Sequence, residues 1–423
     1  MDTVQQAAVT IISQVLSGRN LNQVLSEVLS ASTTLTQQQR GALQDLSYGT
    51  LRYYGQLSSV LDALLNKPVQ DIQIRNLLLI ALYQLEYTKA APHAVVDFAV
   101  NAVRKRNPAA SGLVNAILRN FLRNKSPLLL EAARTEEGRY SYPKWWINEV
   151  KSQYGDKAEA ILLAGNTHPP MTLRVNHKRT TTADYLGLLM QNGIQARVVE
   201  PDAIQLAQAL PVDKLPGFMD GLVSVQDAGA QYAAGFLDVQ QGMCVLDACA
   251  APGGKSAHLL ELAEIELTAL DKDVVRLERV QENMQRLQLR ARLLTGDAAI
   301  PADWWDGQLF QRILADVPCS ATGVVKRHPD IKWLRRAADI QGFAQQQLQI
   351  LNALWPLLAA EGKLLYATCS IFGRENQQVI NEFLSTHSDA KQLSIAASGM
   401  IQGQLLPNDE HDGFFYALLH KPK

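Results

Sequence analysis

Two cysteines stand in short polar motifs where they could act as thiol nucleophiles. Cys319 lies in Asp316-Val317-Pro318-Cys319-Ser320 and Cys369 in Thr368-Cys369-Ser370, and each motif follows an aliphatic run that predicts a buried strand. A thiolate can add to carbon 6 of a pyrimidine, which makes carbon 5 nucleophilic. A carboxyl group can hold the ring near nitrogen 3, and a further group must remove the carbon 5 proton before the thiol leaves. Cys369, Asp316 and Cys319 meet these three needs.

The cysteines have no spacing typical of a metal site. All four, which are Cys244, Cys249, Cys319 and Cys369, fall in the C-terminal half, and none forms a CxxC pair. Each is therefore either a small core residue or a reactive thiol. Two cysteines at the ends of neighbouring strands above one pocket fit the core alternative less well than either alone. The order Asp-Val-Pro-Cys differs from the Asp/Asn-Pro-Pro-Tyr/Phe of amino methyltransferases, which disfavours attack on an exocyclic amine.

A glycine turn, residues 247–256, joins the aliphatic run 243–246 to the helical pattern of residues 257–263. Its paired glycines would let backbone N–H groups and a helix N-terminus face a ligand. A phosphate loop of the GxxxxGK[ST] kind is excluded, because its first glycine would fall on Cys249. The dinucleotide fingerprint GxGxxG is absent. A nucleoside cofactor such as S-adenosylmethionine and a plain Pro-Gly turn both remain open.

Two carboxylates follow the next predicted strands. Asp271 ends the second strand, at the distance from the glycine turn where an acid bonds a ribose in doubly wound folds. Asp297 ends the third strand, where the adenine edge would lie. For each residue alone, capping of a helix N-terminus is an equal alternative. Together with the glycine turn, they favour a nucleoside cofactor.

The pattern of the whole chain predicts three domains. Its 423 residues carry 40 basic and 41 acidic side chains, which is ordinary globular material. We expect an all-helical domain over 1–141, a small α+β (RRM-like) module over 142–240, and an α/β Rossmann-like domain over 241–423. The start lacks a signal-peptide pattern and no apolar run is long enough to span a membrane, so we expect a cytoplasmic protein.

Finer expectations follow from periodicity. Helices are expected over 4–16, 21–29, 37–66, 72–87, 93–106, 111–125, 183–191 and 375–385. Strands are expected over 171–176, 196–199, 244–248, 267–270, 291–294, 313–317 and 363–368, with residues 400–406 and 413–420 forming a hairpin at an antiparallel edge.

Several basic segments could contact nucleic acid. No acidic residue occurs from Arg104 to Lys125, so this helical region predicts a basic face that either is simply solvated or contacts RNA phosphates. Arg174 and Lys178 could also touch phosphate. The basic loop 321–336 with Trp333 suits gripping of phosphate and stacking on an unpaired base, or is a capped, solvated loop.

Taken together, these motifs resemble a known family. The glycine turn, Asp271, Asp297 and both cysteine motifs are similar to those of the S-adenosylmethionine-dependent RNA cytosine-5 methyltransferases, the NOL1/NOP2/Sun family. With a front region, residues 93–119, that resembles NusB-like domains, the chain is similar to bacterial 16S ribosomal RNA methyltransferases of the RsmB (Fmu/Sun) type. The resemblance implies methylation of carbon 5 of one unpaired or hairpin-loop cytosine in 16S ribosomal RNA through a covalent Cys–C6 adduct, with S-adenosyl-L-homocysteine as the by-product.

The resemblance also assigns roles to residues. In that family the Thr-Cys-Ser thiol is the nucleophile and the Pro-Cys-Ser thiol promotes product release, so Cys369 and Cys319 take these roles, and Lys255 orients the reacting groups. The cofactor residues that carry over are Ala248, Cys249, Ala250, Ala251, Pro252, Gly253, Gly254, Asp271, Asp297 and Asp316. We expect a monomer with no metal and no membrane partner. A non-catalytic RNA-binding or assembly protein with a degenerate methyltransferase fold is disfavoured by the two thiols and Asp316. A DNA cytosine-5 methyltransferase is disfavoured by the Thr-Cys-Ser motif and the front domain.

Overall fold

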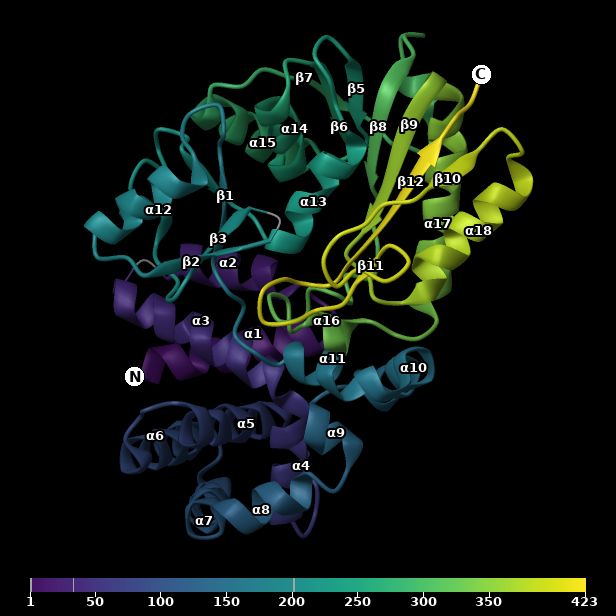
Figure 1. The fold of residues 1–423 in the computed structure, drawn as a ribbon. Helices are drawn as coiled ribbons and strands as arrows, with labels where there is room; N and C mark the ends of the chain where they lie inside the picture. The colour runs from purple at the N-terminus through teal and green to yellow at the C-terminus, as the bar shows by residue number, and fades with distance from the viewer. Residues whose placement is uncertain (1, 33, 201) are drawn as a thin grey trace. The chain divides into compact units, whose positions relative to one another are not determined.

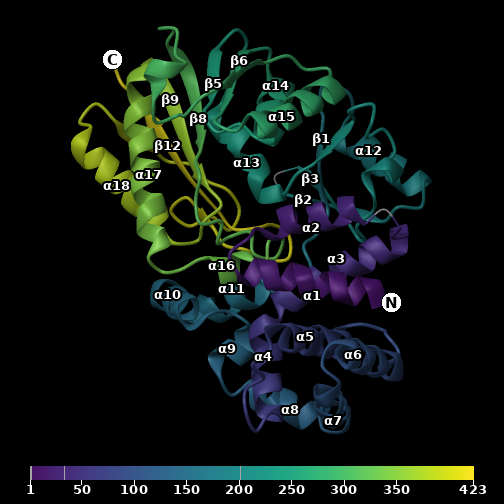
Figure 2. The same cartoon turned by 180° about the vertical axis from the view of Figure 1, so that it is seen from behind.

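The computed structural model of the chain describes residues 2–32, 34–200 and 202–423. It divides into two compact units (Figure 1 and, from behind, Figure 2). The first unit is Met1–Thr167 with Val325–Ala337, and the second is His168–Val324 with Ala338–Lys423. In the described part of the chain, no helix combines the length and the apolar character needed to cross a membrane.

The first unit is helical, which confirms the prediction for the front of the chain. Its helices are α1 (Asp2–Leu16), α2 (Leu21–Ala31), α3 (Gln37–Arg52), α4 (Tyr54–Leu64), α5 (Ile72–Tyr87), α6 (Pro92–Arg106), α7 (Ser111–Arg123), α8 (Lys125–Ala132), α9 (Glu136–Tyr140), α10 (Lys144–Tyr154), α11 (Ala158–Ala164) and α16 (Ile331–Leu334). The single helix expected over 37–66 is wrong. The backbone leaves helical geometry at Tyr53 (φ −107°, ψ 17°), where α3 ends and α4 begins.

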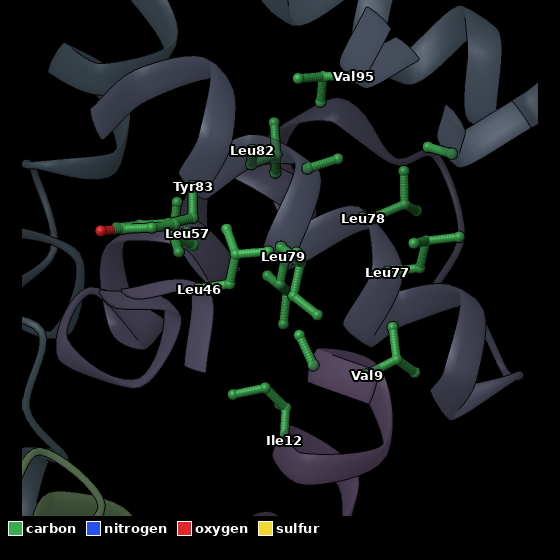
Figure 3. Packing of buried hydrophobic residues seen from close by; sticks show 14 of the residues in the cluster. Val9, Ile12, Leu46, Leu57, Leu77, Leu78, Leu79, Leu82, Tyr83 and Val95 are labelled. Carbon is green, nitrogen blue, oxygen red and sulfur yellow. The ribbon is translucent and has the colours of Figure 1, made fainter. Parts of the chain in front are cut away.

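Helix α5 forms the centre of this unit. All residues from Leu77 to Leu85 are buried, so the helix is covered on every side rather than along one stripe. Figure 3 shows its leucines packed among side chains of surrounding helices, including Ile12 of α1, Leu46 of α3 and Val95 of α6. A helix that is apolar all round has to be buried in this way, because any exposed face would leave leucines in water.

The second unit contains a small antiparallel sheet. Its strands are β1 (Thr172–Val175), β2 (Ala196–Val199), β3 (Ala203–Leu206) and β4 (Val223–Val225), in the order β2-β3-β1-β4. Helix α12 (Thr182–Gln191) packs Tyr185 and Leu189 against Leu173 and Ile204 of this sheet. The two strands and the helix expected here are confirmed, whereas β3 and β4 were not predicted. Both are short, and their alternation is weak.

A larger sheet of mixed direction follows, which confirms the α/β prediction. Its strands are β5 (Cys244–Asp247), β6 (Glu266–Asp271), β7 (Arg292–Thr295), β8 (Phe310–Asp316), β9 (Leu358–Thr368), β10 (Lys391–Leu393), β11 (Gln404–Leu405) and β12 (Phe414–His420). The order is β10-β12-β9-β8-β5-β6-β7, and the neighbouring strands β9, β8, β5, β6 and β7 run parallel to one another. The chain moves outward in one direction from β5 to β7 and in the other from β8 to β9. The switch between β5 and β8 is where such sheets bind ligands, beyond the carboxyl ends of the strands.

Helices cover both faces of this sheet (Figure 1). Successive residues of a strand point to opposite faces. Leu246 and Ile313 therefore join a core with α17 (Asp339–Leu354) and α18 (Gln377–Thr386), whereas Val245 and Leu314 join a core with α13 (Ala228–Leu237), α14 (Gly254–Leu262) and α15 (Val274–Leu287). Burial on both faces explains why these strands read as continuous aliphatic runs.

The C-terminal edge differs from the prediction in one respect. The hairpin of β11 and β12 is present, and β12 pairs antiparallel with β9. However, β12 is an interior strand, because β10 pairs with its other side and forms the edge. Strand β10 has only three residues, two of them polar, so it gave no strand pattern in the sequence.

Candidate active site

The parallel pairing of β8 and β9 brings the two cysteine motifs together. Asp316 lies opposite Ala367, and the Val317 N–H donates to the Ala367 carbonyl at 3.1 Å as the strands end. Just beyond, the Sγ atoms of Cys319 and Cys369 are 3.4 Å apart, and both residues are partly exposed. Residues 50 positions apart in the chain therefore form one thiol pair, hereafter the cysteine pair.

The surroundings of Cys319 keep its thiol protonated. The hydrogen bond shared with Cys369 raises the pKa of Cys319 well above its usual range, and burial and the negative charge of Glu375 act in the same direction. A thiolate of high pKa is a strong proton acceptor once it forms.

An ion pair stands beside the cysteine pair. Lys255, in the first turn of α14, donates from Nζ to Oδ2 of Asp316 at 2.5 Å. Burial alone would lower the pKa of Lys255, but the Asp316 carboxylate outweighs it, with a smaller contribution from Cys369, and the pKa is raised. Lys255 thus stays charged and fixes one carboxylate oxygen of Asp316. The side chains are 14% and 29% exposed, so the pair is shielded in part but not closed off from solvent.

The glycine turn follows β5 at the switch point of the sheet. Gly253 has φ 94°, a value that disfavours other residues, and a Cβ there would lie 3.0 Å from Val280. At Gly254, which begins α14, a Cβ would lie in ordinary contact with Gln226, at 3.8 Å. The turn is attached to the next strand, because Ala250 N–H donates to Leu270 O at 2.9 Å.

The two carboxylates proposed for a nucleoside do not cap α-helices. Asp273, not Asp271, caps α15 by accepting from the N–H groups of Val275 and Arg276. Asp271 is buried and accepts from Ala251 N–H of the glycine turn at 3.1 Å. Asp297 is partly exposed and accepts from Ala299 N–H at 2.9 Å, in a turn with no α-helix after it. Each carboxylate has further lone pairs for hydroxyl or amine donors.

The remaining residues of the turn are mostly shielded. Asp247 is 1% exposed and accepts from Ser256 Oγ at 2.6 Å, and burial raises its pKa to about 7. Burial also raises the pKa of Cys249, which packs against the core on the α17 side of the sheet. Cys249 is therefore suited to line a pocket with its backbone and not to act as a nucleophile.

Donors and acceptors around the turn fit a nucleoside with a charged tail. Asp271 and Asp297 offer acceptors near the ends of β6 and β7, and the turn offers the N-terminus of α14. In the described residues, no group of three or more His, Cys, Asp or Glu side chains could hold a metal ion.

The phosphate contact expected for Arg174 is wrong. Its side chain is 2% exposed and forms a two-pronged ion pair with Glu261 of α14, at 2.8 Å from Nε and 2.7 Å from Nη2. Nη1 donates to Gly254 O at 2.6 Å. Arg174 thus connects β1 to the helix that follows the glycine turn.

The roles expected for Lys332 and Trp333 are also wrong. Both lie in the segment 325–337 that belongs to the helical unit. Lys332 is fully buried, and its Nζ donates to Arg52 O at 2.7 Å and Asn166 Oδ1 at 2.8 Å. Trp333 Nε1 donates to Leu51 O at 2.7 Å, and its ring packs edge-on against Tyr54. Their spacing in the sequence could not distinguish a stacking platform from a packing anchor.

One charged residue near the thiols was missed. Glu375 is fully buried and accepts hydrogen bonds from the residues that follow both cysteines. The sequence signal for this residue is its position six residues after Cys369, where the next helix was expected to begin.

Comparison with known proteins gives matches along the chain. The family "16S rRNA methyltransferase RsmB/F" matches residues 234–420, a "Methyltr_RsmF/B-like, ferredoxin-like domain" matches 142–213, and the NusB family matches 2–123. Proteins named ribosomal RNA small subunit methyltransferase B are similar: that of Vibrio cholerae is 43% identical over 99% of this chain and 97% of its own length, and that of Pseudomonas putida is 44% identical over 98% of each.

Two solved structures share the fold. The crystal structure of PH0851 covers 99% of both chains with a TM-score of 0.80 at 24% identity. A methyltransferase homolog protein from Pyrococcus horikoshii, 26% identical, covers 70% of this chain and 99% of its own with a TM-score of 0.60.

Proposed function

Because the chain belongs to the RsmB/F family of 16S ribosomal RNA methyltransferases, we propose that it methylates carbon 5 of a cytosine in 16S ribosomal RNA. The methyl donor in this proposal is S-adenosylmethionine. The relatives named above support a small-subunit ribosomal RNA as substrate. The observation that carries the carbon 5 chemistry is the 3.4 Å approach of the two thiols beside the Lys255–Asp316 pair.

In the proposed first step, Cys369 as a thiolate attacks carbon 6 of the cytosine. A bond forms between sulfur and carbon 6, and the π electrons of the ring double bond become available at carbon 5. Asp316, held at one oxygen by Lys255, places its carboxyl group near ring nitrogen 3 and shares a proton there as charge develops. The Lys255 ammonium limits the movement of this carboxylate, so its geometry is set before the base arrives.

S-Adenosylmethionine, when bound, supplies a methyl group on a sulfonium centre. Transfer of this methyl group would break its bond to sulfur and leave S-adenosylhomocysteine, so carbon 5 would carry both the methyl group and its original proton. Cys319 releases its thiol proton to water and, as a thiolate, takes the proton from carbon 5. The electron pair of the C–H bond restores the ring double bond, and the bond from Cys369 to carbon 6 breaks. Cys369 leaves as a thiolate, so each catalytic cycle restores it. The raised pKa of Cys319 supports its role as the proton acceptor.

The residues proposed to hold the cofactor surround the glycine turn. Ala248 through Gly254 would contact it with backbone groups, Asp271 would accept from the ribose hydroxyls, and Asp297 would accept from the adenine edge. Asp316 would lie at the end near the reacting methyl group.

The proposed RNA surface includes the basic face of the helical unit. Arg104, Lys105 and Arg106 end α6 and are exposed, and α7 buries Val114, Ile117, Leu118 and Phe121 while Arg119 and Arg123 stay exposed. Such a face suits phosphate contacts that do not read sequence. The target cytosine has to be unpaired or flipped out to reach Cys369.

The test is incubation with labelled S-adenosylmethionine and under-modified small-subunit RNA, followed by nucleoside analysis. We expect 5-methylcytidine. Cys369→Ala should abolish turnover, whereas Cys319→Ala should leave the enzyme bound covalently to RNA, seen as a slow band under denaturing conditions. Cys244→Ala is the matched control, because Cys244 begins β5, at the end of the strand opposite to the glycine turn. Absence of 5-methylcytidine with the wild type would defeat the proposal. An adduct with Cys369→Ala and not with Cys319→Ala would reverse the two roles.

A further inference from the structure

A single buried carboxylate joins the loops that carry the two thiols. Glu375 has no exposed surface and lies in a short 3-10 turn before α18. It accepts from Ser320 N–H at 2.7 Å and from Ser370 Oγ at 2.7 Å, and Ser320 Oγ also donates to it. Ser320 directly follows Cys319, and Ser370 directly follows Cys369. The residue that directly follows each cysteine thus donates a hydrogen bond to the same carboxylate.

The peptide on the other side of Cys319 is held by the same network. Gln347 of α17 donates from Nε2 to Pro318 O at 3.0 Å and to Glu375 Oε1 at 3.2 Å. Its Oε1 accepts from Tyr366 Oη at 3.0 Å, which fixes the orientation of the amide. Cys319 therefore sits between two residues, Pro318 and Ser320, that are both tied to this buried group.

Cys369 is enclosed in a similar way through the residue after Glu375. Asn376 Oδ1 accepts from Thr368 Oγ1 at 2.6 Å, and its Nδ2 donates to Ser370 O at 2.9 Å. The two loops also bond directly, since Gly323 N–H donates to Cys369 O at 2.8 Å. The cysteine pair is therefore placed by backbone held on both sides of each thiol.

The chemistry of these contacts requires an acceptor at Glu375. A carboxylate only accepts, and four donors surround it: the N–H and the hydroxyl of Ser320, the hydroxyl of Ser370 and the side-chain amide of Gln347. An amide at this position would turn one acceptor into a donor facing those groups. Burial raises the pKa of Glu375, and the hydrogen bonds from Ser320, Ser370 and Gln347 oppose that rise.

We propose that Glu375 is a positioning residue that fixes the distance between the Cys319 and Cys369 thiols, so that both can act on one cytosine. Cys369 has to reach carbon 6 and Cys319 the proton on the adjacent carbon 5, so their separation must match neighbouring ring atoms. This inference rests on the proposed function. It adds that the two loops are aligned by one buried carboxylate and that contacts to each loop serve different steps.

The first test is Glu375→Gln, compared with Glu382→Gln, an exposed residue of α18. We expect kcat for methyl transfer to fall about 10- to 100-fold in Glu375→Gln, as for a misplacement near 1 Å, with KM for RNA within about threefold of wild type. Glu382→Gln should match wild type. Rates are expressed per titrated active site. A general loss of folded protein would then lower the number of active sites and leave kcat per site unchanged. Equal kcat in the two variants would overturn the inference.

The second test separates the two loops and remains informative if Glu375→Gln does not fold. Ser320→Ala removes the hydroxyl contact on the Cys319 side and leaves the backbone N–H contact to Glu375, so the covalent RNA adduct should accumulate. Ser370→Ala removes the contact on the Cys369 side, so the adduct should form slowly and not accumulate. The same adduct level in both variants as in Glu382→Gln would contradict the assignment.

The third test does not depend on methyl transfer. Phenylarsine oxide forms two As–S bonds with a pair of close thiols and releases water. Wild type should bind one equivalent at the cysteine pair, Cys319→Ala should not, and Glu375→Gln should bind at least about tenfold more weakly. If wild type binds the arsenical but makes no 5-methylcytidine, the proposed function fails. If Glu375→Gln binds as tightly as wild type, the positioning role fails.

Discussion

Breaking the buried ion pair between Arg174 and Glu261 should lower the free energy of unfolding by a measurable amount. The side chains are 2% and 3% exposed, and two hydrogen bonds join them. Arg174→Met leaves a carboxylate buried without its partner, which typically costs about 3–5 kcal/mol. With an unfolding slope near 3 kcal/mol per molar urea for a unit of this size, the urea midpoint should fall by about 1–1.7 M.

The matched control is the exposed pair of Arg292 and Asp306, whose side chains are 51% and 42% exposed. Arg292→Met should leave the urea midpoint close to that of wild type, because water and salt screen such pairs. Unfolding is followed by circular dichroism in urea for wild type and both variants. Equal midpoints for Arg174→Met and Arg292→Met would refute the reasoning.

A double variant tests whether the loss comes from the unpaired charge. Arg174→Met with Glu261→Leu removes both charges, so it should recover at least half of the lost stability. It should not recover cofactor affinity, because Arg174 also donates to Gly254 O at 2.6 Å and thereby holds the start of α14. Titration with S-adenosylmethionine measures this. Full recovery of affinity would show that the Gly254 contact has no part in cofactor binding.

Two further predictions concern the glycine turn and its helix. Lys255→Met should lower kcat about 100-fold by releasing Asp316. Lys255→Arg should have a kcat between those of wild type and Lys255→Met, because a guanidinium cannot reproduce the single short contact. An unchanged initial rate of methyl transfer in Lys255→Met would contradict this. The pKa of Asp247 is about 7 in the folded protein, against an ordinary value of 3.8, so between these pH values only the folded state holds a proton on this carboxyl. The contribution of Asp247 to stability is therefore complete below about pH 4 and declines as the pH rises through 7. The decline should reach about 4 kcal/mol in wild type and vanish in Asp247→Asn, measured as thermal midpoints from pH 4 to 8; the same slope in both proteins would exclude Asp247 as its source.

The sequence by itself determined the fold class and the main site motifs. Aliphatic runs such as 244–246 and 313–315 predict buried strands, and glycines, carboxylates and cysteines directly after those runs must lie at one edge of a parallel sheet. That rule needs only local patterns, because strand direction follows from helices placed between strands. The helical front and the α/β end were predictable for the same reason.

Only the tertiary structure decided which polar side chains are used inside the protein. Basic and aromatic side chains are typical RNA contacts, and Arg174, Lys332 and Trp333 are of these types. Each of the three instead donates hydrogen bonds within the protein to residues far away in the sequence. The same holds for Glu375, whose donors come from residues 320 and 370. Burial of a charge depends on long-range packing that supplies its partners. A pattern read along the chain does not contain those distances, whereas the 3.4 Å between two thiols 50 residues apart exists only once β8 and β9 have paired.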